Sequence, residues 1–283
     1  MDLQAIVQAI AILGGVCLVF GVLIATAHSR LKVWEDPRIE AVTEMLPGSN
    51  CGACGFAGCR AFAEGLVEQT VQPAGCTQMT PDGMGSVASF LGVDAGAAVK
   101  RVARLLCAGG ADVAIQQAEY RGLATCGAAA VISSGGKGCS WGCIGLADCE
   151  RACDYDAIHM DANGLPRVTL DKCTACEDCV EACPKDLFTV MPVDQKLLVQ
   201  CRSLLEGDEA LELCRVACNA CGRCALDAAE GVVTMEDGLA VVHYEHNERA
   251  ASDAIARCPT GAIAWVEGAQ FKTPRVPETE TAR

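Results

Sequence analysis

The sequence predicts an α+β protein made of small domains that follow one long apolar helix at the N-terminus. Three observations lead to this prediction. Cysteine accounts for 21 of the 283 residues while aromatic residues make up only 4%, and residues 3–27 contain no charged side chain. The second half of the chain also repeats part of itself at an offset of 75 residues. Few aromatic residues leave little material for one large core, so small domains held by metal or disulfide staples are expected.

The overall composition excludes two broad classes of protein. A formal net charge of −14 argues against nucleic-acid binding, which requires basic surfaces. A hydrophobic content of 51% excludes general disorder. The length of 283 residues suggests about two domains as a soft prior.

Residues 1–28 are predicted to form a single transmembrane anchor. The uncharged run over residues 3–27 is long enough to cross a bilayer as one helix. A cleaved signal peptide would begin with basic residues, whereas here Arg30 and Lys32 follow the apolar run. Positive charge on that flank predicts that the later domains lie on the cytoplasmic side of the inner membrane. That compartment is reducing, so thiols remain available for metal. A buried soluble helix is the alternative.

Residues 29–90 are predicted to form a membrane-proximal domain with a [4Fe-4S] cluster. After an expected helix at 37–45, four cysteines follow the spacing C-x2-C-x4-C-x16-C, namely Cys51, Cys54, Cys59 and Cys76. Glycines between the first three would let the backbone fold back around a cluster, and a helix is expected at 60–68. A structural zinc ion is the alternative.

Residues 139–192 contain eight cysteines in two groups. The second group reads C-x2-C-x2-C-x3-C-P, the ligand run of a bacterial ferredoxin, in which the fourth cysteine binds the other cluster. The first group departs from that form, since it reads C-x3-C-x5-C-x3-C and is followed by Asp154. A zinc site or a disulfide framework is the alternative. We predict two [4Fe-4S] clusters, one on Cys139, Cys143, Cys149 and Cys183, the other on Cys153, Cys173, Cys176 and Cys179.

Residues 193–268 are predicted to be a second ferredoxin-like module with one cluster. At the offset of 75 residues, five cysteines fall on cysteines: Cys126 on Cys201, Cys139 on Cys214, Cys143 on Cys218, Cys149 on Cys224 and Cys183 on Cys258. The four predicted ligands of one cluster instead fall on Ala228, Glu248, Ala251 and Ala254. One whole site is therefore lost and the other kept. Its predicted ligands are Cys218, Cys221, Cys224 and Cys258, with Cys214 as the alternative to Cys221.

The prediction is thus four [4Fe-4S] clusters on sixteen cysteines. Cys17 lies in the apolar run and is interpreted as a small apolar residue. The remaining cysteines are Cys107, Cys126, Cys201 and Cys214. They are interpreted as buried free thiols, and a fifth cluster is the alternative.

The remaining segments carry weaker signals. Residues 91–138 are predicted to be a linker, with helical patterns at 87–91 and 97–106, and residues 269–283 a disordered tail. Strands of the two modules are expected at 157–160, 167–170, 188–191, 232–235, 240–243 and 262–266.

Two phrases of the chain resemble a known family. LPGSNCGACGFAGCRAFAEG after a membrane helix, and GCSWGCIGLADCERAC later, are similar to the long form of the B subunit of the Rnf-type ion-translocating ferredoxin:NAD oxidoreductase complex, over roughly residues 1–266. The resemblance implies one subunit of a redox-driven Na⁺ or H⁺ translocase, with no complete active site on this chain. Its implied partners are soluble ferredoxin and the other membrane subunits. We expect electrons to enter at the C-terminal modules and leave at the Cys51 site. The alternatives are an electron-wiring subunit of another membrane oxidoreductase, such as a hydrogenase, or a membrane-tethered iron–sulfur sensor.

Overall fold

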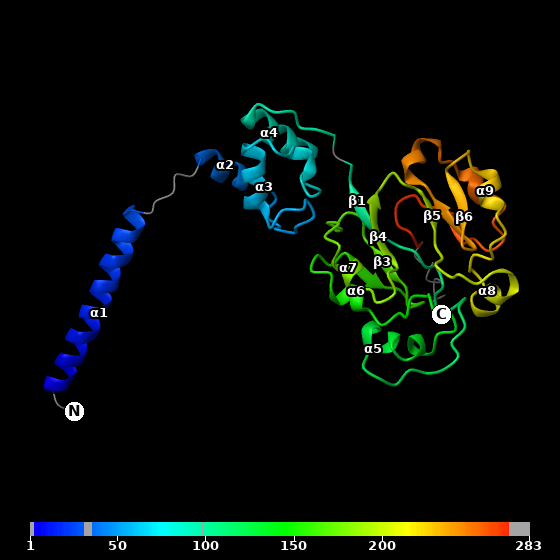
Figure 1. Ribbon diagram of the computed structural model, residues 1–283, viewed down its shortest axis with the longest axis horizontal. Coiled ribbons are helices and arrows are strands. Elements are labelled where there is room, and N and C mark those ends of the chain that lie inside the picture. The colour runs from blue at the N-terminus through cyan, green and yellow to red at the C-terminus, as the bar shows by residue number, and fades with distance from the viewer. Residues whose placement is uncertain (1–2, 31–35, 98, 272–283) are drawn as a thin grey trace, which may run out of the picture.

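The computed structural model describes residues 3–30, 36–97 and 99–271. Figure 1 shows helix α1 (Leu3–Arg30), then a small helical domain, then a larger region of paired strands and short helices. The side chains described in α1, those of residues 11–27, are all exposed. In the part of the chain that the structure describes, no helix combines the length and the apolar character needed to cross a membrane. The anchor over residues 1–28 therefore stays a prediction.

The small helical domain packs around one apolar core. Val42, Phe62 and Val87 come from three different helices, and each is at most 1% exposed, so they form the centre of this core. The predicted helices at 37–45 and 60–68 are present, the second shifted by one residue, and residues 87–91 lie in α4 as expected. The elements of this domain are α2 (Pro37–Met45), α3 (Cys59–Val67), the 3-10 turn η1 (Pro73–Gly75) and α4 (Pro81–Leu91).

Local signals fix where helices α2 and α4 begin. The Asp36 carboxylate accepts a hydrogen bond from the Arg38 backbone N–H at 2.9 Å, and the Thr80 hydroxyl accepts one from Gly83 N–H at 3.2 Å. A proline follows each of these capping residues and needs no hydrogen-bond partner in the first turn. Helix α4 ends at Gly92 in the left-handed conformation.

The first ferredoxin-like module consists of two antiparallel strand pairs and two short helices. Strand β1 pairs with β4, with Leu105 opposite Phe188, and β2 pairs with β3, with Ile158 opposite Val168. Helices α6 and α7 each carry one cysteine of the predicted ligand runs. The elements are β1 (Arg101–Leu105), α6 (Asp148–Arg151), β2 (Ile158–Met160), β3 (Pro166–Val168), α7 (Asp178–Glu181) and β4 (Phe188–Pro192).

The predicted helix at 97–106 is wrong, because this segment contains strand β1. Four of the five residues in β1 are buried, including Val102 and Arg104, so both faces of the strand are covered. A strand buried on both faces lacks the alternating pattern of polar and apolar residues that identifies a half-buried strand.

Much of the segment predicted as a linker joins the two modules. Strand β1 belongs to it, as do α5 (Cys126–Ala130) and the turn η2 (Ser133–Gly136). Ala108 N–H donates to the Gln200 carbonyl at 3.0 Å, and Ile115 N–H donates to the Leu213 carbonyl at 2.9 Å. These hydrogen bonds attach the segment to the second module.

The second module repeats the architecture of the first. Strand β5 pairs with β8, with Val199 opposite Ile263, and β6 pairs with β7, with Val233 opposite Val242. All six predicted strands are present within two residues, whereas β1 and β5 were not predicted. The elements are β5 (Leu197–Val199), α8 (Gly207–Leu213), α9 (Arg223–Asp227), β6 (Val233–Glu236), β7 (Leu239–Val242), the 3-10 turns η3 (Tyr244–Arg249) and η4 (Ser252–Ile255), and β8 (Ile263–Trp265).

The beginning of the predicted tail contacts strand β1. The Gln270 amide accepts a hydrogen bond from Leu105 N–H at 2.9 Å and donates one to the Leu105 carbonyl at 2.5 Å. Arg104 donates to the Gly268 carbonyl at 2.9 Å. The prediction of disorder is therefore wrong for residues 269–271, and residues 272–283 lie outside the described residues.

Candidate metal centres

The cysteines surround four pockets of nearly equal volume, and four cysteines line each pocket. The volumes are about 310, 320, 330 and 330 Å³. All 21 cysteines are free thiols. Among the described residues, no group of three or more His, Cys, Asp or Glu side chains is spaced to hold a single metal ion. In the order of the volumes, the cysteines are Cys51, Cys54, Cys59 and Cys76; Cys153, Cys173, Cys176 and Cys179; Cys218, Cys221, Cys224 and Cys258; and Cys107, Cys139, Cys201 and Cys214.

The first pocket lies in the helical domain and brings together the four cysteines predicted there. The Asn50 side-chain oxygen accepts a hydrogen bond from Cys59 N–H at 2.8 Å and fixes the start of α3. Gly58 has a φ of 144°, and a Cβ at this position would lie 3.0 Å from that oxygen. A glycine is therefore required for the loop to close. Burial raises the pKa of Cys76.

The second pocket lies in the first module and also unites a predicted set. Cys179 is carried by α7, and burial raises its pKa to about 12, with the neighbouring Cys173 adding to the rise. Ala103 N–H donates to the Cys173 sulfur at 3.5 Å. The Thr174 hydroxyl lies beside the Cys176 thiol. Within the described residues this buried hydroxyl has no nitrogen or oxygen partner, which leaves it available to a sulfur atom.

The third pocket lies in the second module and includes Cys221 rather than Cys214, the alternative that the spacing had left open. Cys224 is on α9, and burial raises its pKa to about 11. Cys258 differs, because hydrogen bonds from backbone groups, including that of Ile263, outweigh its burial and lower its pKa. Cys221 is exposed, unlike the buried Cys224.

The remaining predicted set is only partly brought together. Cys143, Cys149 and Cys183 pack against the core of the first module, whereas Cys139 lines the fourth pocket. Burial raises the pKa of both Cys143 and Cys149 to about 12. The nearest sulfurs that add to this rise are Cys107 at Cys143, and Cys126 followed by Cys183 at Cys149. The sequence had treated Cys107 and Cys126 as free thiols.

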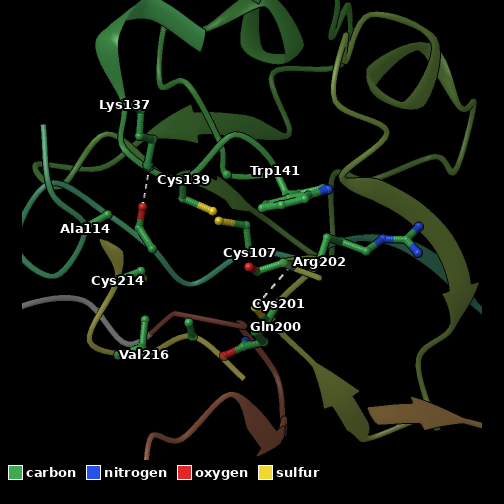
Figure 2. A pocket seen from close by; sticks show the side chains of 14 residues that line it. Cys107, Ala114, Lys137, Cys139, Trp141, Gln200, Cys201, Arg202, Cys214 and Val216 are labelled. Carbon is green, nitrogen blue, oxygen red and sulfur yellow. Dashed lines mark hydrogen bonds between the residues drawn. The ribbon is translucent and has the colours of Figure 1, made fainter. Parts of the chain in front are cut away.

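The fourth pocket was not predicted. Its lining comes from both modules and includes Trp141 and Arg202 besides the four cysteines (Figure 2). The Lys137 ammonium donates to the Gly109 carbonyl at 2.5 Å and to the Cys143 carbonyl at 2.6 Å. The signal that was missed is a cysteine two residues after a strand, which occurs after β1 and again after β5.

The residues around these pockets fit [4Fe-4S] clusters. Four thiol sulfurs around one small pocket are the usual donor set of such a cluster. Backbone N–H groups also point at cysteine sulfurs, since Leu187 donates to Cys183 at 3.5 Å and Ser203 donates to Cys201 at 3.4 Å. Hydrogen bonds to ligand sulfurs are one of the means by which proteins set cluster potentials.

Neighbouring cysteine sets lie close to one another. The Thr77 hydroxyl, on the first pocket, donates to the Thr174 carbonyl, on the second pocket, at 2.9 Å. Burial raises the pKa of Tyr155, and both Cys51 and Cys176 add to the rise, so this phenol lies near both sets. The Cys179 thiol is also a neighbour of Cys149, and Cys218 is a neighbour of Cys201.

Two family models match the chain. A model described as a putative Fe-S cluster matches residues 46–78, which include the first pocket's cysteines. A model described as a 4Fe-4S dicluster domain matches residues 139–187. The matched segments thus cover the helical domain's loop and the first module.

Three curated relatives resemble most of the chain, and each is the B subunit of a membrane redox complex. The chain is 38% identical to that of the Na(+)-translocating ferredoxin:NAD(+) oxidoreductase complex of Acetobacterium woodii, over 92% of the chain and 78% of that protein. It is 34% identical to that of the proton-translocating ferredoxin:NAD(+) oxidoreductase complex of Clostridium ljungdahlii, over 92% and 93%. It is 33% identical to that of the ion-translocating oxidoreductase complex of Methanosarcina acetivorans, over 92% and 98%.

Proposed function

The chain belongs to the B-subunit family of ion-translocating ferredoxin:NAD oxidoreductase complexes, and on that premise we propose that it carries single electrons between a soluble ferredoxin and the other subunits of a membrane complex. Family membership and the 4Fe-4S dicluster match make it an iron–sulfur electron-transfer subunit. The complex is an oxidoreductase, and we assign no substrate-converting site to this chain. Whether Na⁺ or H⁺ is moved depends on subunits other than this one.

We propose the sixteen predicted cysteines as the iron ligands. A bound [4Fe-4S] cluster gains or loses one electron without any bond being made at carbon. The chain's own residues hold the thiolates in place, keep water away and direct N–H groups at the sulfurs. Burial of Cys76, Cys149 and Cys179 supports the exclusion of water. The Ala103 N–H aimed at the Cys173 sulfur supports the tuning role.

The observation that carries the proposal is the contact between Thr77 and Thr174. This hydrogen bond of 2.9 Å joins the loops of two four-cysteine pockets from different domains. Each threonine immediately follows a predicted ligand, Cys76 or Cys173. An electron-transfer protein requires its redox centres at short spacing and in fixed order, and this contact supports both requirements.

We place exchange with soluble ferredoxin at the second module. Cys221 is exposed there, and Leu226 on the adjoining helix is 79% exposed. An exposed ligand supports access by an external protein. The opposite end of the chain supports the membrane side, since the side chains of Leu13, Phe20 and Ile24 on α1 are between 60% and 71% exposed. We therefore keep α1 as the proposed anchor, with the basic Arg30 on the cytoplasmic flank.

The proposed order can be tested with Cys54→Ala in the complete complex, purified anaerobically. Reduced ferredoxin should still reduce the second module, as followed by low-temperature EPR, while electron delivery to the membrane subunits should fall to background. Cys17→Ala is the matched control, because that cysteine belongs to none of the pockets, and it should leave both readouts unchanged. Undiminished delivery in Cys54→Ala would contradict the order.

The partner subunits can be tested separately. Flavin-containing membrane subunits should co-purify with a tagged form of the full chain. Recovery of a nickel–iron hydrogenase in their place would point to the alternative wiring role.

A further inference from the structure

We propose that Cys107, Cys139, Cys201 and Cys214 hold an additional [4Fe-4S] cluster, which bridges the two ferredoxin-like modules. The proposal rests on the proposed function, because it assumes that the other cysteine pockets carry clusters of the same kind. It assigns a role to three cysteines that the spacing had left without one, and it moves Cys139 to a different site.

The first observation is that this pocket matches the other three. Its volume is about 330 Å³, against about 310, 320 and 330 Å³ for the pockets that unite the predicted sets. Its four thiols are the same donor set, and each is at most 9% exposed. Figure 2 shows the sulfurs of Cys107 and Cys139 directed toward one another from different loops. The chain thus offers a fourth enclosed pocket with nothing but cysteine as metal donor.

The second observation is a local symmetry between the modules. Cys107 follows the end of β1 by two residues, and Cys201 follows the end of β5 by two residues. The strand pairs agree in register, since Leu106 N–H donates to the Leu187 carbonyl at 2.7 Å and Gln200 N–H donates to the Ala262 carbonyl at 2.6 Å. Each module therefore places one cysteine at the same point of the same fold.

The symmetry extends to the other pair and to the hydrogen bonds. Cys139 and Cys214 are related by the repeat offset of 75 residues. Cys143 N–H donates to the Cys107 sulfur at 3.4 Å, and the backbone of Cys218, 75 residues later, is hydrogen-bonded to the Cys201 sulfur. Each module thus contributes an equivalent pair of ligands, and neither module alone completes the set.

The walls of the pocket are shaped to leave the sulfurs room. A Cβ at Gly109 would lie 3.1 Å from the Cys214 sulfur and 3.7 Å from the Cys107 sulfur. The Lys137 ammonium is held beside the pocket by two carbonyl groups and supplies a positive charge close to Cys139 and Cys214. Four thiolates gathered in one place require such a compensating charge.

Moving Cys139 leaves Cys126 to complete the set of Cys143, Cys149 and Cys183. The loop before α5 is fastened to α6, which carries Cys149. Gly127 N–H donates to the Asp148 carboxylate at 3.0 Å, and Arg151 donates to the Ala124 carbonyl at 3.1 Å. With this change every cysteine outside α1 belongs to one of five sets of four.

The test is iron and acid-labile sulfide analysis of the full chain, purified anaerobically. The proposal expects about twenty irons per chain, whereas the sixteen predicted ligands alone give about sixteen, at four irons per cluster. The double variant Cys107→Ala/Cys201→Ala removes one ligand from each module. It should lose about four irons and one EPR component while keeping the rest. Cys17→Ala is the control and should keep the full count.

Each outcome decides the matter. A count of about sixteen in the unchanged chain, or a double variant that keeps its full iron content, would overturn the bridging site alone. A chain that folds without any iron would overturn the proposed function as well. If the double variant does not fold, the count for the unchanged chain still decides, with about twenty in favour and about sixteen against.

Discussion

The two ferredoxin-like modules have the same strand pairs but fill one half of the fold in different ways. In the first module, Cys153, Cys173, Cys176 and Cys179 surround a pocket. In the second module, the equivalent positions are Ala228, Glu248, Ala251 and Ala254. Ala254 is 2% exposed and packs with Leu197 and Val232, which are at most 1% exposed. A four-cysteine pocket is therefore replaced by an apolar core.

The helices around that half are also joined differently. In the second module, Asp227 on α9 accepts hydrogen bonds from Arg257 at 2.8 and 3.0 Å. The Arg257 guanidinium thereby holds the pKa of the Asp227 carboxyl below its ordinary value. The equivalent residues of the first module are Ala152 and Ala182. The comparison teaches that one small fold can be held either by metal ligands or by apolar packing with an ion pair.

Iron removal is the strongest test of this difference. Chelation of the anaerobic protein should abolish amide hydrogen-exchange protection in β2 and β3, because the free energy of metal binding is part of the folding free energy of that module. Strands β6 and β7, which pack on the apolar core, should keep more of their protection. We expect the fall in protection to be roughly 100-fold larger in the first module. Equal loss in both modules would break the comparison.

Leu197→Ala should have the next largest effect and act on the second module. This side chain is 0% exposed in the apolar core, so truncation should destabilise the module by about 2–5 kcal/mol. Denaturant unfolding followed by tryptophan fluorescence of Trp265 measures the change. Leu226→Ala is the control, because Leu226 is 79% exposed and its truncation should change stability by about 0.5 kcal/mol or less. Iron at the Cys179 site should remain in both variants.

Lys137→Met tests a charge that differs between the modules. Lys137 lies beside cysteine sites of the first module, and the equivalent residue of the second module is the exposed Glu212. Loss of the nearby cation favours the oxidised state, so redox titration followed by EPR should show at least one component moved to lower potential. Glu212→Gln should leave every component in place. No movement in either variant would show that this charge difference has no redox effect.

Arg257→Gln should have the smallest effect. The ion pair with Asp227 is at the surface, where such pairs contribute little and are screened by salt. The variant should lower the thermal midpoint of the second module slightly at low salt, and the difference should disappear at high salt. A variant whose deficit persists at high salt would mean that Arg257 acts through packing instead.

The sequence predicted most of the fold that is local. Helix α2 and the six strands follow short-range patterns, and the pockets of Cys51 and Cys179 follow ligand runs closed within one domain. Strand β1 was missed because both of its faces are buried. The fourth pocket was missed because Cys107 and Cys201 are 94 residues apart, while the rest of the repeat is offset by 75. The insertion that contains α5 causes this mismatch, and it aligned Cys126 with Cys201.

The divided origin of the fourth pocket sets an order for maturation of the protein. All four cysteines of the first pocket leave the ribosome within the stretch from Cys51 to Cys76. The pocket shared by the modules cannot form until Cys214 has been synthesised and the second module has docked on the first. Because domains generally fold from the N-terminus during synthesis, its metal would be the last to be acquired. A nascent chain that stalls before Cys201 would therefore be incomplete in a way that the N-terminal half cannot repair.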